Sequence, residues 1–165
     1  MSESIVIIEE GRPKQQKYES LLPQIQAIIT GEPDMIANMA NITAALKEQF
    51  NWWWTGFYIV REDQLVLGPF QGPVACTRIM RSRGVCGTAW AEDRTLIVDN
   101  VNEFAGHIAC SSASQSEIVL PVHFDGKVIS VLDIDSEHLA HFDLTDQHYL
   151  EKLIKGLEDN IAGEP

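Results

Sequence analysis

Residues 110–136, CSSASQSEIVLPVHFDGKVISVLDIDS, contain the pattern on which the fold depends. Two β-rich segments, Glu117 to Phe124 and Lys127 to Asp135, flank the pair Asp125-Gly126. Such a pair is a strong signal for a two-residue hairpin turn, because both positions of the turn require positive φ angles, which Asp and Gly tolerate. The stretch therefore predicts an antiparallel hairpin, around which we expect the rest of the chain to assemble.

The second strand of this hairpin ends in two carboxylates, Asp133 and Asp135. Side chains alternate along a strand, so both leave the same face of the sheet, about 7 Å apart. Like charges at that distance repel each other, and together they are suited to bind a cation. The alternative is a pair of solvated residues at a strand end. Because Cys110 and Glu117 place a thiol and an acid at the other end of the hairpin, we favour a shared site.

Length and charge limit the class of protein. The chain has 165 residues, with 12 basic and 24 acidic side chains and a formal net charge of −12. This length predicts one domain that folds without disulfides or metals as structural support. The excess of acidic groups disfavours nucleic acid and anionic membrane surfaces as partners.

The first residues do not form a signal-peptide pattern, because acidic side chains stand beside a very short apolar run. No later segment approaches about 18 consecutive apolar residues, the length that a membrane-spanning helix needs. We therefore expect a cytoplasmic protein. Charged residues and glutamines interrupt any period in residues 1–17, which are expected to form an arm before a domain at residues 18–165.

Apolar periodicity predicts three long helices, at residues 18–29, 34–50 and 144–161, the last capped by Asp143 or Thr145. Strands are expected, besides the hairpin, at residues 52–61, 65–67, 77–80 and 96–98. A short helix is expected at residues 87–92. This order is an α+β pattern, in which an antiparallel sheet carries the N- and C-terminal helices on one face and a ligand pocket on the other.

Three cysteines, Cys76, Cys86 and Cys110, lie in segments rich in Gly or Ser. Zinc sites usually pair ligands two to four residues apart. Here the separations are ten and twenty-four residues, so no metal site is predicted. A lone cysteine is commonly a small buried hydrophobe, but the loop context favours thiol chemistry. Cys86 is expected near a helix N-terminus, where the helix dipole would lower the pKa of its thiol.

Trp54, Gly56 and Tyr58 share one face of the first predicted strand. A glycine between two aromatic residues leaves a notch with aromatic walls, because no side chain fills the space between the rings. Ordinary core packing is one interpretation. The other is a pocket wall that accepts a small soft group such as a methyl thioether.

Five segments closely resemble the GAF-domain free methionine-(R)-sulfoxide reductases: WWWTGFYIVR (52–61), GPFQGPVACTRIMRSRGVCGTAW (68–90), TLIVDNV (95–101), HIACSSASQSEIVLP (107–121) and VISVLDIDS (128–136). The match extends over residues 18–161, and the cysteines fall at the family's spacing. The resemblance implies a single GAF-like domain that reduces free methionine (R)-sulfoxide with thioredoxin as reductant. It implies no cofactor, and it makes a homodimer plausible.

The resemblance also assigns roles to residues. Cys110 matches the cysteine that attacks the sulfoxide sulfur, Cys76 a resolving cysteine, and Cys86 a second thiol that can take part in resolution. The substrate ligands that it implies are the acidic residues Glu117, Asp133 and Asp135 and the aromatic residues Trp54 and Tyr58.

The chemistry that the resemblance implies needs a proton donor, because the sulfoxide oxygen leaves only after protonation. A carboxyl group whose pKa is raised by its like-charged neighbours can supply that proton. The strict register of the hairpin conflicts with this picture, because it places Glu117 opposite Ile134 and on the other face from the two aspartates. A bulge or strand end must intervene, and Pro121, which cannot donate to a ladder, is the expected place.

Two other classes of function compete with the enzyme. A non-enzymatic GAF sensor would bind a small ligand and signal through its terminal helices, but it would not need three thiols in loops. A structural interaction module would carry its cysteines incidentally. Consumption of NADPH in the presence of thioredoxin, its reductase and free methionine sulfoxide separates the enzyme from both.

Overall fold

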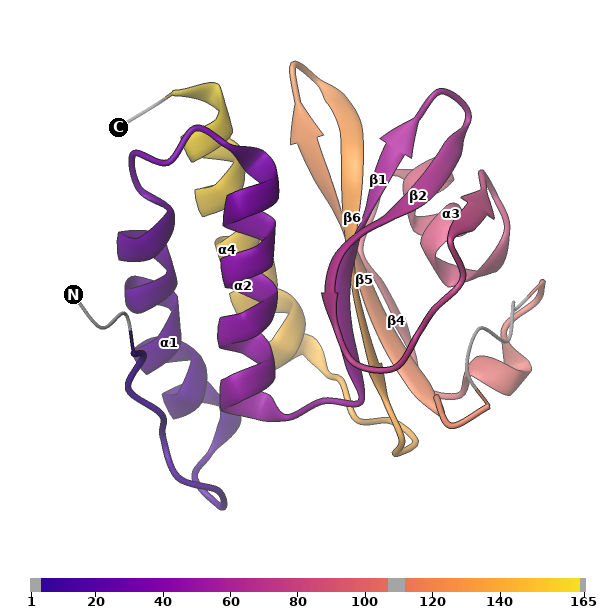
Figure 1. Ribbon diagram of the computed structural model, residues 1–165. Helices are drawn as coiled ribbons and strands as arrows, with labels where there is room; N and C mark the ends of the chain where they lie inside the picture. Colours follow the sequence, from indigo (N-terminus) through magenta and orange to yellow (C-terminus); the bar gives the residue numbers. More distant parts are fainter. Residues whose placement is uncertain (1–3, 107–111, 164–165) are drawn as a thin grey trace.

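The predicted hairpin is part of an antiparallel sheet, as the computed structural model shows for residues 4–106 and 112–163 (Figure 1). Within these residues the sheet has six strands in the order β3-β2-β1-β6-β5-β4. The strands are β1 (Trp54–Arg61), β2 (Gln64–Gln71), β3 (Arg78–Met80), β4 (Leu96–Val98), β5 (Ser116–Phe124) and β6 (Lys127–Ser136). The helices are α1 (Lys14–Ile29), α2 (Met35–Phe50), α3 (Gly84–Glu92) and α4 (Leu144–Ala162), with a 3-10 turn at Val101–Glu103.

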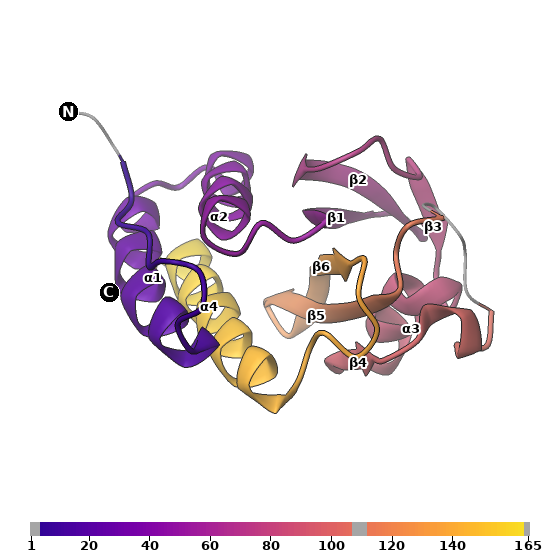
Figure 2. The same ribbon diagram turned by 90° about the horizontal axis from the view of Figure 1, so that it is seen from below.

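The sheet separates two layers (Figure 2). Helices α2 and α4 cover one face, where Phe57 and Leu132 pack among buried helix side chains, and α1 packs on the same side against α2 and α4. Helix α3 and the connections around it cover the other face, where Tyr58 and Val131 join a second apolar cluster. Adjacent residues of one strand thus enter different clusters, as strand alternation predicts. The α+β arrangement with terminal helices on one face is confirmed.

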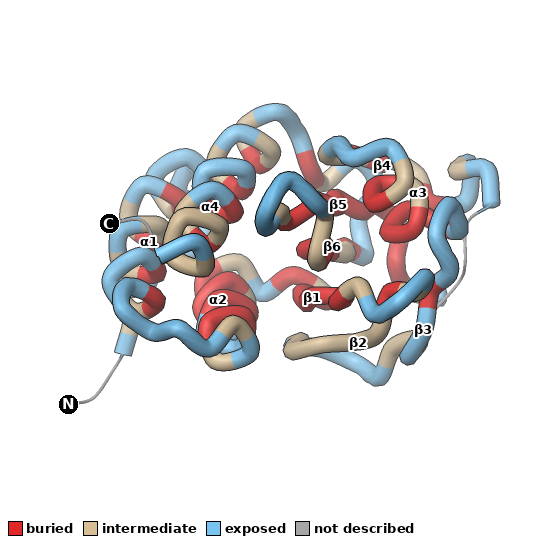
Figure 3. Tube along the Cα trace, turned by 90° about the horizontal axis from the view of Figure 1, so that it is seen from above, coloured by how far each residue is buried: buried red, intermediate tan, exposed pale blue. Residues whose placement is uncertain are grey.

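Burial follows this division (Figure 3). The buried positions of α2 and α4 gather on the sides that face the interior, and those of α1 on the side that faces α2 and α4. Fully burying one Leu or Ile contributes about 1.5–3 kcal/mol to the stability of the fold. A capping box fixes the N-terminus of α4. The Asp143 side chain accepts a hydrogen bond from the backbone N–H of Asp146, and the Asp146 side chain accepts one from the backbone N–H of Asp143. The predicted cap at Asp143 is confirmed.

The turn of the hairpin has the expected geometry, since φ is 51° at Asp125 and 70° at Gly126. A register shift follows: His123 pairs with Val128, whereas Val122 pairs with Ser130. Ile129 is therefore an extra residue in β6, and the bulge at this point places Glu117 directly opposite Asp135.

The predicted bulge exists, but its expected position was wrong. Pro121 lies in the regular ladder opposite Val131. On the other side of β5, strand β4 is paired only as far as Leu96 with Val119. Among the described residues no strand pairs with Pro121 on that side, so the proline needs no bulge.

Most elements begin and end within two residues of the predicted bounds, and three differ by more. Helix α1 begins at Lys14, whose Nζ lies 2.5 Å from Asp146 Oδ2 at the start of α4. Strand β2 continues to Gln71, because the pairing with β1 shifts between Gly56 and Tyr58 and so accommodates the Gly68-Pro69 pair. Helix α3 begins at Gly84 and includes Cys86. Among the described helices, none is long and apolar enough to span a bilayer.

Candidate active site

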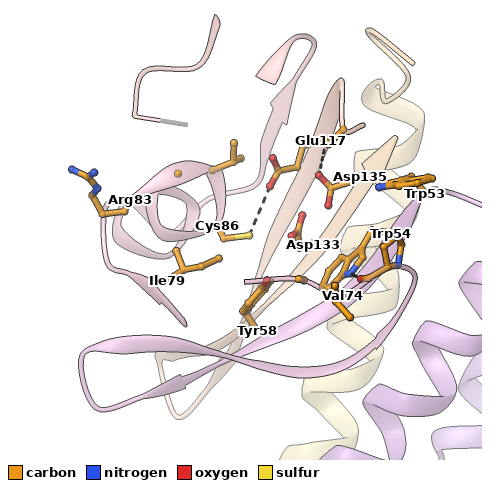
Figure 4. A pocket seen from close by; sticks show the side chains of 15 residues that line it. Trp53, Trp54, Tyr58, Val74, Ile79, Arg83, Cys86, Glu117, Asp133 and Asp135 are labelled. Atoms are coloured by element: carbon orange, nitrogen blue, oxygen red, sulfur yellow. Dashed lines mark hydrogen bonds between the residues drawn. The ribbon is translucent and has the colours of Figure 1, made fainter. Parts of the chain in front are cut away.

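A pocket opens on the sheet face that carries α3 (Figure 4). Strands β1, β5 and β6 form its floor, α3 one wall, and the connection between β2 and β3 another. The predicted residues Trp54, Tyr58, Cys86, Glu117, Asp133 and Asp135 all line it. The fold thus brings together the acidic and aromatic residues that the sequence singled out.

The three carboxyl groups form one cluster. Glu117 and Asp135 are directly opposite on β5 and β6, and Asp133 follows two residues away on the same face. Glu117 and Asp133 are each only 6% exposed. Ser114 donates a hydrogen bond of 2.6 Å to Asp135 Oδ1, whereas Asp133 Oδ1 has no hydrogen-bond partner among the described residues.

Burial changes how these groups titrate. It raises the pKa of Glu117 well above its usual range, and the charges of Asp133 and Asp135 raise it further. Burial and then Asp133 raise the pKa of Asp135 in the same way. For Asp133, burial raises the pKa to about 6, opposed by hydrogen bonds with Glu117 and Cys86. The cluster therefore holds protons at a pH where exposed carboxyl groups have lost them.

Cys86 projects from α3 toward this cluster (Figure 4). Its thiol is free and only 4% exposed, and Sγ donates to Glu117 Oε1 at 3.8 Å. Burial raises the pKa of the thiol well above its usual value, and the nearby carboxylates, Asp133 first among them, raise it further. The prediction that the helix dipole lowers this pKa was wrong, because desolvation and negative neighbours outweigh the dipole.

Of the other two cysteines, the structure describes Cys76. Cys76 is half-buried in the connection between β2 and β3, next to Ala75 of the pocket lining, and its carbonyl accepts a hydrogen bond of 2.9 Å from the Tyr58 hydroxyl. This bond ties the connection to the pocket floor. The predicted nucleophile, Cys110, lies outside the described residues.

The aromatic wall is present but has a different shape from the predicted notch. The rings of Trp54 and Tyr58 are stacked with centroids 5.8 Å apart. A Cβ atom at Gly56 would lie 2.5 Å from Cη2 of Trp54, so the indole itself fills the space above the glycine. Trp54 Nε1 donates to the carbonyl of Pro73 at 3.1 Å. Gly56 therefore serves the close approach of Trp54.

Several other lining residues were not singled out from the sequence, among them Trp53, Val74 and Ser114. Val74 is an apolar side chain that is 90% exposed at the pocket. Ser114 belongs to the Ser-rich run after Cys110, but only the folded register shows that it reaches Asp135. Arg83 is the one cationic side chain among the described lining residues, and it points away from the acidic cluster (Figure 4).

Comparison with known proteins places this geometry in a family. The GAF domain family matches residues 34–162. GAF domain-containing protein A of Dictyostelium discoideum is 59% identical over 147 residues, which are 88% of this chain and 93% of that protein. Free methionine-R-sulfoxide reductase of Escherichia coli (strain K12) is 44% identical over 150 residues, 90% of this chain and 91% of that protein. The structure of free methionine-R-sulfoxide reductase from Neisseria meningitidis in complex with its substrate has a TM-score of 0.91, with 51% identity and 96% of each chain covered. This chain belongs to the GAF-domain family of the free methionine-R-sulfoxide reductases.

Proposed function

We propose that this chain reduces free L-methionine (R)-sulfoxide to L-methionine, with electrons from a cysteine thiol. The observation that carries the proposal is the cluster of the buried Glu117 and Asp133 and the half-buried Asp135 beside the rings of Trp54 and Tyr58. Such a cluster accepts the charged ammonium group of a free amino acid, which a methionine residue inside a protein lacks. The complex of the Neisseria meningitidis relative with its substrate supports the assignment.

The pKa values divide the roles of the carboxyl groups. Asp133, with a pKa of about 6, is mostly ionised at neutral pH, and its unpartnered Oδ1 accepts the substrate ammonium. Burial raises the pKa values of Glu117 and Asp135 well above the usual range, so these groups keep a proton to donate to the sulfoxide oxygen. The methyl group of the substrate then contacts Trp54 and Tyr58.

The reaction proceeds by attack of the Cys110 thiolate on the sulfoxide sulfur. A carboxyl group protonates the oxygen, which is then transferred from the substrate sulfur to Cys110: the substrate sulfur–oxygen bond and the transient sulfur–sulfur bond break, a sulfur–oxygen bond forms on Cys110 as a sulfenic acid, and methionine leaves. A second thiol condenses with the sulfenic acid, which releases water and forms a disulfide. The dithiol of thioredoxin reduces this disulfide by exchange. Such a cycle suits the reducing cytoplasm.

Cys76 is the better candidate for the second thiol. The Cys86 thiol is buried against Glu117 with a pKa raised well above its usual value, first by burial, so it is a poor nucleophile. Cys76 lies in a connection at the surface of the pocket, where Gly72 with φ of 138° provides a backbone conformation that other residues rarely adopt. We therefore assign the resolving step to Cys76.

The test is NADPH consumption with thioredoxin, thioredoxin reductase and separate (R) and (S) epimers of free methionine sulfoxide. Turnover of the (R) epimer is expected, together with its loss in Cys110→Ser and its partial retention in Cys86→Ser. Methionine release by Cys110→Ser in a single turnover at the wild-type rate would refute the role of that cysteine. Tight binding of the sulfoxide without turnover in the wild type would indicate a GAF sensor instead.

A further inference from the structure

The pocket contains donor atoms that suit a metal ion as well as an amino acid. Cys86 Sγ and one carboxylate oxygen each of Glu117 and Asp133 all lie within 4.8 Å of one another. They come from α3, β5 and β6, so secondary structure fixes their relative positions. The spacing of the cysteines in the sequence did not predict a zinc site with several cysteine ligands. In the folded chain only one of the three ligands is a cysteine, and the other two are carboxylates that the fold brings next to it.

The separations fit a tetrahedral ion. Zinc binds thiolate sulfur at about 2.3 Å and carboxylate oxygen at about 2.0–2.2 Å, which places two such ligands about 3.6 Å apart in a tetrahedron. Cys86 Sγ and Glu117 Oε1 are 3.8 Å apart. Side-chain shifts of a few tenths of an ångström are therefore enough for both to ligate one ion.

A second observation points to a cation at this place. The side chain of Asp133 belongs to a residue that is only 6% exposed, and its Oδ1 has no hydrogen-bond partner among the described residues. Figure 4 shows the side chains of Asp133, Glu117 and Cys86 converging on the pocket, while Arg83 points away. A buried carboxylate oxygen without a donor is stabilised by a cation more than by any neutral ligand.

We propose that the reduced protein binds one zinc ion through Cys86, Glu117 and Asp133, and that the bound ion excludes the amino-acid substrate from the pocket. The thiol ligand favours zinc over magnesium and calcium, which prefer oxygen ligands. Binding displaces the thiol proton of Cys86 and the carboxyl proton of Glu117 into solvent and forms one sulfur–zinc bond and zinc–oxygen bonds to Glu117 and Asp133, without any change of oxidation state. The fourth position of the ion remains open to water.

Metal binding stands independently of the proposed reductase activity, and only the exclusion of methionine sulfoxide rests on it. The full-length protein, kept reduced by a phosphine rather than by a chelating dithiol, is titrated with zinc chloride in a calorimeter. It is also titrated with cobalt(II), whose thiolate complex has a charge-transfer absorption band. One ion per chain and a thiolate–cobalt band are expected in the wild type.

Variants identify the ligands. Cys86→Ser should abolish the cobalt band, and both Cys86→Ser and Asp133→Asn should weaken zinc binding at least about 100-fold, because even residues behind the ligands affect affinity 10–100-fold. The double variant His138→Ala/His141→Ala is the control for zinc binding at imidazoles outside the pocket, because these two rings are 5.7 Å apart and do not line it. It should bind zinc like the wild type. Circular dichroism tests whether each variant is folded. If Cys86→Ser does not fold, the zinc affinity of Asp133→Asn tests the proposal.

The proposal is overturned if the wild type binds no zinc stoichiometrically, or if Asp133→Asn binds it with unchanged affinity. Free methionine sulfoxide should lower the apparent zinc affinity in proportion to its concentration. Zinc binding that depends on Cys86 and Asp133 but ignores methionine sulfoxide would leave the metal site intact and refute the substrate pocket. The two proposals therefore fail separately.

Discussion

Glu117 and Asp135 face each other directly across β5 and β6, although the two-residue turn that joins these strands would place Glu117 opposite Ile134. The extra residue Ile129 accounts for the difference, and it moves Glu117 to the face of the two aspartates. The cluster therefore depends on a bulge near the turn, at the other end of the hairpin.

Neutralising Glu117 and Asp133 should have different kinetic effects. Glu117→Gln removes a proton donor and should lower kcat about 10²–10⁴-fold, the usual contribution of general acid catalysis. Asp133→Asn removes the charged partner of the substrate ammonium and should act mainly through KM. Steady-state kinetics with free methionine (R)-sulfoxide measures both. An equal loss of kcat with unchanged KM in the two variants would contradict this division of roles.

The stability of the protein should fall as the pH rises. A carboxyl group whose pKa is higher in the folded protein than in the unfolded chain binds its proton more tightly in the folded state. This proton binding stabilises the fold fully when the pH is below the pKa of the unfolded chain, and the stabilisation is lost as the pH rises through the pKa of the folded protein. For Asp133, which burial raises from 3.8 to about 6, the loss is about 3 kcal/mol at most. It develops between about pH 4 and pH 6, while Glu117 and Asp135 extend the decline to higher pH because their pKa values are raised further.

Urea unfolding of the reduced protein between pH 4 and pH 8 measures this decline. Glu117→Gln should make the decline shallower, because an amide carries no charge at any pH and no longer repels Asp133. Glu48→Gln, on the exposed side of α2, is the matched control and should follow the wild type. Free energies of unfolding that are constant over this range would show that the cluster is solvated in solution.

Substrate selection should depend on the free ammonium group. N-acetylmethionine sulfoxide leaves the buried acidic cluster without its charged partner, which costs on the order of 2–5 kcal/mol. The expected result is a kcat/KM at least about 30-fold lower than for free methionine sulfoxide. Asp133→Asn should reduce this preference. Similar kcat/KM values for the two compounds with the wild type would exclude ammonium recognition by the carboxyl groups.

Gly56→Ala should disturb the aromatic wall. The new Cβ atom would meet Phe70 Cβ at 2.4 Å and the Trp54 ring at 2.5 Å, so the indole must move. Overpacking of this kind usually costs about 1–3 kcal/mol, and the displaced ring should also raise KM. Thermal unfolding and steady-state kinetics test the two effects.

The matched control is Gly156→Ala in α4, where the nearest atoms belong to the flexible side chain of Gln26. Gln26 can move aside, and alanine is favoured over glycine in a helix by about 1 kcal/mol. This variant should be as stable as the wild type or more stable. A Gly56→Ala protein with unchanged stability and KM would show that Trp54 does not depend on the glycine.

The parts of the fold that depend on local sequence could be predicted. The turn at Asp125-Gly126, the cap at Asp143 and the shared face of Asp133 and Asp135 follow from backbone preferences and strand alternation. The pairing of β5 with β6 could be predicted too, because only two residues separate the strands.

The features that were missed depend on contacts between distant segments. The position of the bulge at Ile129 reflects packing along the whole hairpin, which no local signal at Pro121 could reveal. The pKa of Cys86 depends on carboxyl groups 31 residues away or more in sequence, as its contact with Glu117 shows. The stacking of Trp54 over Gly56 needs Phe70 of β2 as a second wall. Resemblance to a family supplied the residue roles, but it did not supply this geometry.

The sheet divides the apolar interior into one cluster beneath α1, α2 and α4 and another around α3 and the pocket. The two clusters lie on the same strands but contain different side chains. The segments over the pocket can therefore unfold locally while α1, α2 and α4 stay packed. Amide hydrogens on the α3 side would then exchange through local fluctuations, and those of α1 and α4 only through global unfolding.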